Sequence, residues 1–350
     1  MARKEEKKPR SIFKTILKII LVLLIVVIIL VAAILGGAYW YVNNKLSKMQ
    51  QVEIEEEELQ IDEQVEENLT GYRNIAIFGV DSRDSDFGKG NRSDCIIIAS
   101  INNATKEVKL ASVYRDTYVQ IDGYGLDKIT HAYSYGEAPL ALATLNTNLD
   151  LNIKEFVTVN FDAVAEAINL LGGVEIEITN AELKYINSYI KGTSDNTGIQ
   201  SEYIYTAGKQ NLDGVQAVSY GRIRYTEGGD YKRTERMRDV IEAMLKKLQT
   251  KSVGEINSLL DQILPKIYTN IEPSSIMKEI PKITKYRVTQ SIGWPYETRG
   301  ITLDRWYGIP ITLESNVQKM HLELFEEQDY VVSDTVKNIS NKIANKTGYR

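Results

Sequence analysis

Residues 78–100 read FGVDSRDSDFGKGNRSDCIIIAS, and this stretch indicates the fold class. An apolar segment, 74–79, runs into a turn crowded with charge, and the chain then resumes as the apolar segment 94–101. Short apolar runs bounded by turn residues are typical of strands buried in a sheet. A third segment, 107–113, alternates polar and apolar residues. We therefore expect three strands, with a charged turn between the first two.

Helical periodicity follows these strands. Apolar residues recur at helical spacing and stop at a glycine pair before the alternating strand 174–178; they are Phe161, Val164, Ala165, Ile168 and Leu171. Further helices are expected at 213–219 and from about 230 to 248. Strands that alternate with helices predict an α/β domain. The polar segment 192–198 is expected to be a surface loop, and the polar last twenty residues are expected to fray.

Composition excludes several kinds of site. With 350 residues, 43% of them hydrophobic, the chain can bury a core in one large domain or two small ones. Cys95 is the single cysteine, so the chain cannot form an internal disulfide. His131 and His321 are the only histidines, which argues against a zinc site. The sequence has neither a P-loop nor a nucleophile elbow, and we expect no nucleic-acid partner.

An uncharged, strongly apolar stretch between Lys18 and Lys45 predicts a membrane anchor, since a bilayer needs roughly 20 such residues. A cleaved signal peptide is the alternative, but its apolar region has only about 7–15 residues. Basic residues precede the stretch and acidic residues follow it, which places the N-terminus in the cytoplasm and the rest outside. The expected order is a cytoplasmic tail, a single transmembrane helix and an acidic extracellular stalk, at residues 1–18, 19–42 and 43–70.

Arginines gather where strands and helices are expected to end. Arg115 closes the third strand, and in an extended segment 220–225 the side chains of Arg222 and Arg224 would share one face. Arg233 and Arg236 come next, three residues apart on the expected helix. For any one of them a surface salt bridge is the simplest explanation. If the strand ends meet, however, several guanidiniums need carboxylates or a bound polyanion, and the planar guanidinium fork suits phosphate.

Asp81 and Asp94 flank the charged turn and would repel each other unless they share a cation. Mg²⁺ is commonly held by one or two carboxylates together with substrate phosphates. Arginines, two aspartates and a divalent ion together indicate a pyrophosphate site.

An ordered series of motifs between about Tyr72 and Leu248 resembles the LytR-CpsA-Psr family. The series comprises Phe78-Gly-Val-Asp81-Ser-Arg, Arg92-Ser-Asp94, Ser112-Val-Tyr-Arg115-Asp116, Asp127-Lys-Ile-Thr-His131, Asn160-Phe161, Leu171-Gly-Gly-Val174, Leu212-Asp-Gly214, Tyr220-Gly-Arg222-Ile-Arg224 and Gly229-Asp230-Tyr-Lys-Arg233-Thr-Glu-Arg236. The sequence departs from the family pattern at Tyr114, Lys232 and Met237.

The resemblance implies a three-layer α/β/α fold with a central mixed sheet and an apolar pocket for a polyprenyl chain. It implies a catalytic domain at 71–335, followed by a polar tail at 336–350. It further implies Mg²⁺ bound by Asp81 and Asp94. The pyrophosphate headgroup would be held by Arg92, Arg115, Arg222, Arg224, Arg233 and Arg236, and the catalytic set would be Asp81, Arg92, Arg115, Asp116, Arg222 and Arg224.

Members of this family transfer a glycopolymer, of the wall teichoic acid or capsule type, from undecaprenyl pyrophosphate to the muramic acid of peptidoglycan. The resemblance thus implies three partners: the lipid-linked polymer, peptidoglycan and the cytoplasmic membrane. Two alternatives stay open, a non-catalytic polyprenyl-phosphate-binding regulator of the envelope and a lipid-pyrophosphate hydrolase. No general base is evident, and Asp81 and Asp116 are the candidates. Positioning and electrostatics can do most of the work on an activated phosphoanhydride.

Overall fold

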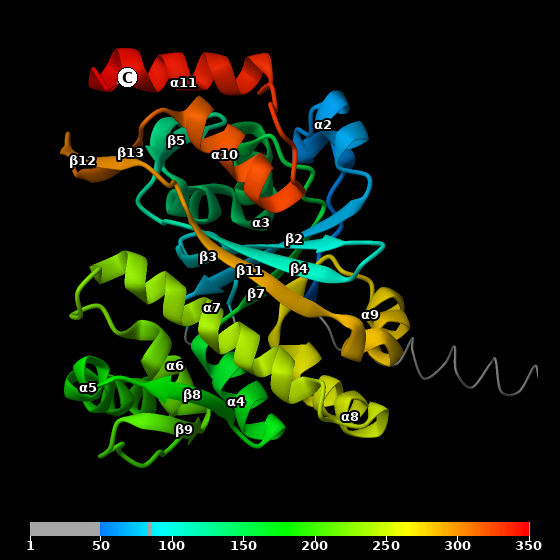
Figure 1. Cartoon of the computed structure of the whole chain (residues 1–350), viewed down its shortest axis with the longest axis vertical. Coiled ribbons are helices and arrows are strands. Elements are labelled where there is room, and N and C mark those ends of the chain that lie inside the picture. Colours follow the sequence, from blue (N-terminus) through cyan, green and yellow to red (C-terminus); the bar gives the residue numbers. More distant parts are fainter. Residues whose placement is uncertain (1–49, 83–85, 350) are drawn as a thin grey trace, which may run out of the picture. The chain divides into compact units, whose positions relative to one another are not determined.

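A seven-stranded mixed sheet organises the part of the chain that the computed structural model describes, residues 50–82 and 86–349 (Figure 1). The strand order is β1-β10-β7-β2-β3-β4-β11. The predicted strands are β2 (Tyr72–Val80), β3 (Ser93–Asn102) and β4 (Glu107–Val113), and each is antiparallel to the next. In parallel orientation, β7 (Glu155–Val159) pairs with β2 and β11 (Arg287–Trp294) pairs with β4. The register of β2 with β3 shifts after Gly79, where the charged turn leaves the sheet.

One face of the sheet is covered by α3 (Ile129–Leu149), α10 (Leu313–Phe325) and α11 (Asp334–Thr347), as Figure 1 shows. Alternate residues of β3 point to this side, so Ile96 and Ile98 lie in its core while Ile97 lies in the core of the opposite face. The hairpins β5 (Tyr118–Ile121) with β6 (Gly125–Lys128) and β12 (Thr298–Thr302) with β13 (Trp306–Pro310) pack at the edge of this layer.

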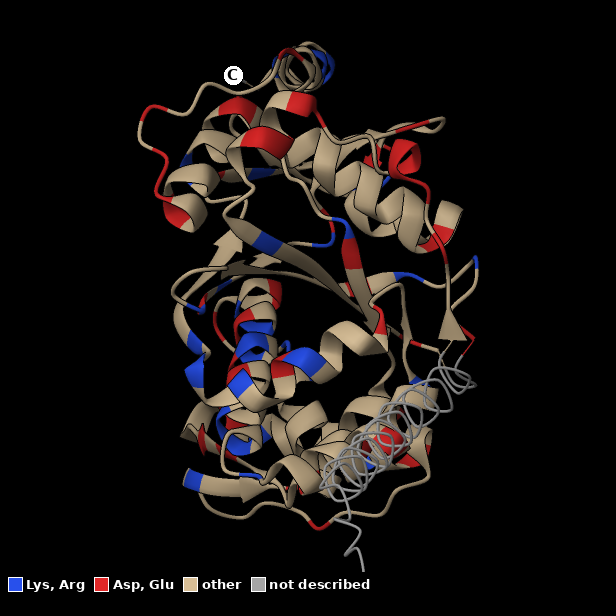
Figure 2. Ribbon diagram, turned by 90° about the vertical axis from the view of Figure 1, so that its right-hand side faces the viewer, with Lys and Arg blue, Asp and Glu red and all other residues tan. Residues whose placement is uncertain are grey.

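The opposite face carries α4 (Phe161–Leu171), α7 (Gly229–Leu248) and α8 (Val253–Ile263). Beyond them lie α5 (Asn180–Thr197), α6 (Gly214–Arg222) and the hairpin β8 (Val174–Ile178) with β9 (Gly208–Leu212), which share a core of their own. The expected fold, a mixed central sheet with helices on both faces, is confirmed. Figure 2 shows basic segments gathered on the side of the sheet that carries α7.

Short elements complete the structure and join its layers. Near the start of the described chain lie β1 (Gln50–Gln51), η1 (Glu56–Leu59) and α2 (Glu63–Asn68). Between α8 and β11 come η2 (Leu264–Lys266), β10 (Tyr268–Thr269), α9 (Pro273–Glu279) and η3 (Ile280–Lys285).

Three expectations about polar segments differ from the structure. Residues 192–198 are not a loop: all but Gly198 form the last turns of α5, whose buried Ile186 and Ile190 pack on α6. The C-terminal residues do not fray, because Val336 and Ile343 of α11 insert into the main core. Within the expected stalk, Leu59, Val65 and Leu69 are buried in that core too, so residues 59–69 are part of the domain.

The predicted transmembrane helix at 19–42 lies outside the described residues. Within residues 50–82 and 86–349, no helix is both long enough and apolar enough to cross a bilayer.

Candidate functional site

An apolar cavity of about 270 Å³ lies between the sheet and helices α4, α6 and α7. Ile77 and Gly79 come from β2 and Cys95 from β3, where burial raises the pKa of the thiol to about 12 and so keeps it neutral. The remaining wall is made largely of aliphatic and small side chains, among them Val159, Val164, Ala217, Val218, Gly221, Val240, Ile241 and Met244. A site with this lining suits a hydrocarbon.

A second cavity, of about 450 Å³, adjoins the first and is lined by charge. Its walls include two aspartates and three arginines, Asp81, Asp94, Arg222, Arg224 and Arg233. Three residues line both cavities, Phe161, Met237 and Arg222. Because these three residues line both cavities, the cavities are neighbours, and a molecule with an apolar tail and an anionic head matches the chemistry of the pair.

Arg222 stands at the junction of the two cavities. It is the last residue of α6, its Nη1 donates a hydrogen bond to Thr193 Oγ1 at 2.9 Å, and its guanidinium lies 4.7 Å from the Phe161 ring centroid. Burial lowers the pKa of Arg222, while nearby Asp81 acts in the opposite direction. The condition that residues 220–225 be extended is not met, since α6 continues to Arg222; Ile223, the residue that caps this helix, has an extended ψ of 126°.

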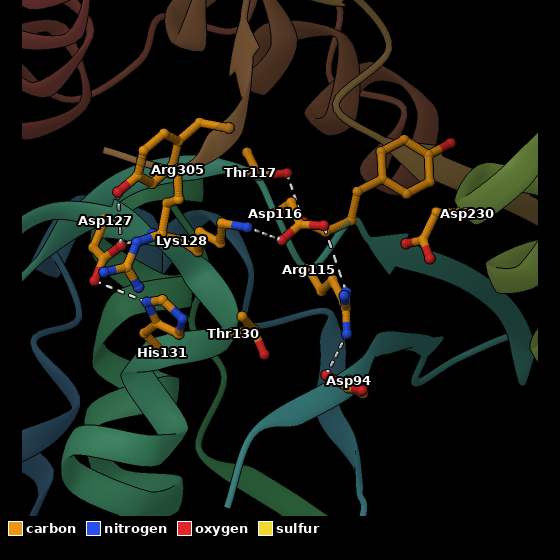
Figure 3. Close-up of polar contacts among 12 residues, drawn as sticks. Asp94, Arg115, Asp116, Thr117, Asp127, Lys128, Thr130, His131, Asp230 and Arg305 are labelled. Carbon is orange, nitrogen blue, oxygen red and sulfur yellow. Dashed lines mark hydrogen bonds and ion pairs between the residues drawn. The ribbon is translucent and has the colours of Figure 1, made fainter. Parts of the chain in front are cut away.

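Asp94 connects arginines from three segments of the chain. Its Oδ1 accepts a hydrogen bond from Arg115 Nη1 at 2.8 Å (Figure 3), and its Oδ2 lies 3.9 Å from Arg224 Nη2. Its backbone carbonyl accepts a hydrogen bond from Arg233 Nη2 at 3.0 Å. Asp230 lies 3.2 Å from Arg233 and 3.7 Å from Arg224. The predicted convergence of distant arginines is therefore present, with carboxylates offsetting the like charges.

The electrostatics of this cluster favour an additional anion. Burial lowers the pKa of Arg233, which is 2% exposed, and the neighbouring Arg224 and Arg115 lower it further, against the effect of Asp230. Burial also acts to lower the pKa of Arg115, but Asp94, Asp116 and Asp230 outweigh it and raise the pKa. A diphosphate would relieve the repulsion among these guanidiniums.

Asp116 lies behind Arg115 rather than in the charged cavity. Its Oδ1 pairs with Lys128 Nζ at 2.6 Å and its Oδ2 lies 3.5 Å from Arg115 Nε (Figure 3). The carboxylate is thus held between two cations, and the structure places it as a residue that orients Arg115. Among the residues that line the cavity, Asp81 is the carboxylate that enters no ion pair with the described part of the chain.

Three predicted ligands, Arg115, Arg92 and Arg236, are not among the residues that line the charged cavity, and Arg115 is linked to it through its ion pair with Asp94. Arg92 is exposed and forms no ion pair or hydrogen bond through its side chain with the described residues, although its carbonyl accepts from the backbone N–H of Asp94. Arg236 is 1% exposed and bonds to Glu182, to the carbonyl of Ile223 and to Thr226. Direct contact of Arg236 with a headgroup does not fit this geometry, because its guanidinium is fully engaged in holding the segment that carries Arg224.

The donor chemistry of the site fits Mg²⁺. Asp81 and Asp94 line the same cavity, and hard carboxylate oxygens are the ligands that Mg²⁺ prefers. Within residues 50–82 and 86–349, no group of three or more His, Cys, Asp or Glu could hold a metal ion. Two carboxylates leave most of an octahedral shell to water and phosphate oxygens.

Sequence reasoning missed several residues of this site. Asp230 carried a signal, since it lies three residues before Arg233 at the start of an expected helix. Thr193, Ser188 and Tyr189 carried none, because they lie on α5, which the polar composition did not reveal. Tyr225 follows Arg224 directly and lines the same cavity.

An apolar cavity that adjoins an arginine- and aspartate-lined cavity defines a site for an amphiphile with an anionic head. The chain belongs to the LytR_cpsA_psr family, whose model matches residues 37–304. It is 32% identical over 243 residues to the polyisoprenyl-teichoic acid–peptidoglycan teichoic acid transferase TagU of Enterococcus faecalis, an alignment that covers 69% of this chain and 74% of that protein.

Solved structures share the fold. One, described as TagT bound to LIIa-WTA, has a TM-score of 0.59 and 23% identity, and the match covers 74% of this chain and 91% of that one. Another, the family protein YwtF (TagT) with bound octaprenyl pyrophosphate lipid, has a TM-score of 0.51 and 20% identity over 79% of this chain and 91% of that one.

Proposed function

We propose that this protein is a membrane-anchored extracellular phosphotransferase. It takes an anionic glycopolymer, of the wall teichoic acid or capsule type, from undecaprenyl pyrophosphate and attaches it to the muramic acid of peptidoglycan. The observation that carries this proposal is the shared wall between the apolar cavity and the charged cavity. The names of its relatives as teichoic acid transferases support it.

In the proposed reaction, the muramic acid C6 hydroxyl oxygen attacks the phosphorus that bears the sugar. A new P–O bond forms, the bond from that phosphorus to the bridging oxygen breaks, undecaprenyl phosphate leaves, and the hydroxyl proton passes to solvent. Arg222, at the cavity junction, holds the phosphate next to the lipid. Arg224 and Arg115 contact the diphosphate oxygens and stabilise the charge that grows on them. Asp116 and Lys128 keep Arg115 in place.

Mg²⁺, held by Asp81 and Asp94, would supply positive charge to the diphosphate oxygens. Asp94 has a second task, since it also positions Arg115 and Arg224. The exposed Arg92 lies at the turn beside Asp94 and is the residue free to reach an incoming phosphate.

The test is a transfer assay with the 350-residue chain in detergent micelles, a lipid-pyrophosphate-linked oligosaccharide, peptidoglycan and Mg²⁺. Mass spectrometry of lipid and wall fractions separates transfer from hydrolysis and from binding without turnover. Arg224→Ala should lower kcat/KM by about 10- to 150-fold, since a hydrogen bond to a charged group is worth about 1.5–3 kcal/mol. The matched control is Arg287→Ala. Arg287 is an exposed arginine that lies 3.9 Å from Glu107, at the start of β4 and thus at the opposite end of this strand from Arg115. Full transfer by Arg224→Ala would sink the proposal.

A further inference from the structure

A third cavity, of about 530 Å³, shares no lining residue with the other two and is not used by the reaction described above. Three tyrosines contribute to its walls, Tyr114 at the end of β4, Tyr231 at the start of α7 and Tyr296 after β11. Its volume falls within the range of about 300–1,000 Å³ that is usual for ligand sites. We propose that this aromatic pocket binds the glycan of the acceptor, an inference that rests on the proposed transferase function.

Helix α7 contributes to all three cavities, with Tyr231 on the opposite face of the helix from Arg233, since residues two apart are turned by about 200°. Tyr231 lines the aromatic pocket, Arg233 lines the charged cavity, Met237 lines both the charged and the apolar cavity, and Met244 lines the apolar one. At 1.5 Å per residue, Tyr231 and Met244 are about 20 Å apart along the helix. The order along α7 is therefore aromatic pocket, headgroup and lipid tail. A nucleophile that displaces the lipid phosphate approaches from the side away from the tail, that is from the N-terminal end of α7, where Tyr231 lies.

Two tyrosines of the pocket are sequence neighbours of residues in the arginine cluster. Tyr114 precedes Arg115, and Tyr231 follows Asp230, the carboxylate that lies beside Arg224 and Arg233. The two tyrosine rings contact each other edge to face, with their centroids 4.4 Å apart. Each of these tyrosines is thus next in sequence to a charged residue of the arginine cluster, Arg115 or Asp230.

The lining suits a saccharide. Aromatic rings offer flat apolar surface to the C–H faces of a sugar ring, and the ring hydroxyls and charged side chains at the edge offer hydrogen bonds. The exposed Glu297 and Arg299 supply a carboxylate and a guanidinium at the rim. The hydroxyls of Tyr296 and Thr298 are buried in the wall and have no hydrogen-bond partner among the described residues.

The wall that carries Tyr296 is rigid before any ligand arrives. Asn316, which is 2% exposed, accepts hydrogen bonds through Oδ1 from the backbone N–H groups of Tyr296 and Glu297, at 2.7 and 3.0 Å. The carbonyl of Asn316 accepts a hydrogen bond from the indole of the fully buried Trp294 at 3.1 Å. A preformed wall lowers the entropy cost of binding.

The sugars of the donor are expected to contact a different set of residues. Ser188, Tyr189 and Tyr225 line the charged cavity from α5 and from the segment after α6. These residues surround the phosphates themselves, where the first donor sugar is attached. The aromatic pocket beyond Tyr231 is therefore assigned to the acceptor.

Two measurements on the full chain in detergent micelles test this assignment. The first is direct binding of a tetrasaccharide of alternating N-acetylglucosamine and N-acetylmuramic acid, without donor or Mg²⁺. The second is steady-state transfer with donor and acceptor varied separately. Tyr231→Ala should raise the tetrasaccharide Kd and the acceptor KM about tenfold. The donor KM should stay unchanged, and Thr298→Val should act in the same direction with a smaller effect. Tyr205→Ala removes another exposed tyrosine, one that is not among the residues lining the cavities above, and should change nothing.

The outcomes separate this inference from the proposed function. A rise in donor KM in place of acceptor KM would assign the pocket to the donor sugars and overturn the inference, as would unchanged constants in both variants. If the unaltered chain transfers nothing, the proposed function fails. The binding measurement then tests the pocket by itself, through the difference in tetrasaccharide Kd between the unaltered chain and Tyr231→Ala.

Discussion

Replacing Glu182 by Gln should destabilise the domain far more than any surface charge change. Glu182 is 4% exposed and its Oε1 accepts a hydrogen bond from Arg236 Nε at 2.7 Å, while Oε2 caps α5 through Thr179. The glutamine keeps the shape but leaves the Arg236 charge buried without its counter-ion, and its single amide oxygen can accept from Arg236 or from the backbone N–H of Thr179, not from both. Breaking a buried pair in this way costs about 3–5 kcal/mol.

The assay is urea unfolding of the full chain at pH 7, followed by tryptophan fluorescence. The matched control is Glu242→Gln, which removes an i,i+4 pair with the exposed Lys246 and should cost about 0.3–0.5 kcal/mol. The reasoning would be refuted if Glu182→Gln lowered the free energy of unfolding no more than Glu242→Gln does.

The same pair predicts an acid dependence. Burial acts to raise the pKa of Glu182, but hydrogen bonds from Arg236 and Thr179 outweigh it and lower the pKa below its ordinary value. A lowered folded-state pKa stabilises the protein above the unfolded value, about 4.3 for Glu, and this stabilisation disappears as the pH falls through the folded-state pKa. The difference between the unaltered chain and Glu182→Gln should therefore shrink as the pH falls below about 4.3. A difference that stays constant from pH 7 to pH 3 would contradict this.

Two further predictions concern packing. Gly214→Ala should lower the free energy of unfolding by about 3 kcal/mol or more, because an added Cβ would lie 1.8 Å from the carbonyl oxygen of Ala165. The control Gly254→Ala, whose added Cβ would have nothing within 4 Å, should leave the melting temperature unchanged or raise it. Equal melting temperatures of the two variants in calorimetry would show that α4 and α6 do not pack this closely. Ile343→Ala in α11 should lower the free energy of unfolding in urea by about 2–5 kcal/mol, since the side chain is 2% exposed. The control Val331→Ala, at a residue that is 73% exposed, should change it by less than about 0.5 kcal/mol. An unchanged free energy of unfolding in Ile343→Ala would mean that α11 contributes nothing to the core.

The sequence predicted three neighbouring strands of the sheet, β2, β3 and β4, because its signals there are strong and local, but it did not predict β1, β7, β10 and β11. Uninterrupted apolar runs define β2 and β3, and regular spacing with a C-terminal glycine defines α4. The helix α7 was predicted from its apolar positions and begins at Gly229, close to the expected start.

The polar helices escaped prediction because tertiary contacts determine them. In α5, Gly192 and the following polar residues suggest a loop, yet Ile186 and Ile190 bury one face and Thr179 with Glu182 caps the start. In α11, four buried positions hold an otherwise polar helix on the core. A single buried stripe is enough to order such segments, and composition averages over it.

The candidate site was predictable in its charges but not in its geometry. The motifs named Asp94, Arg115 and Arg224, and these side chains do meet. The division of labour among the arginines could not be read from spacing. Arg233 lines the cavity, whereas Arg236, one helical turn further on, turns inward to Glu182.

The central claim is that one ligand fills the apolar and the charged cavity together. The most direct test measures the affinity of the full chain for a polyprenyl diphosphate, a polyprenyl monophosphate and inorganic diphosphate. The account predicts that the lipid diphosphate binds at least tenfold more tightly than either fragment. Arg224→Ala should reduce the difference in affinity between the polyprenyl diphosphate and the polyprenyl monophosphate. Ile241→Trp should weaken the binding of both lipids but not that of inorganic diphosphate. Equal affinity for inorganic diphosphate and the lipid, or lipid binding that neither substitution alters, would contradict it.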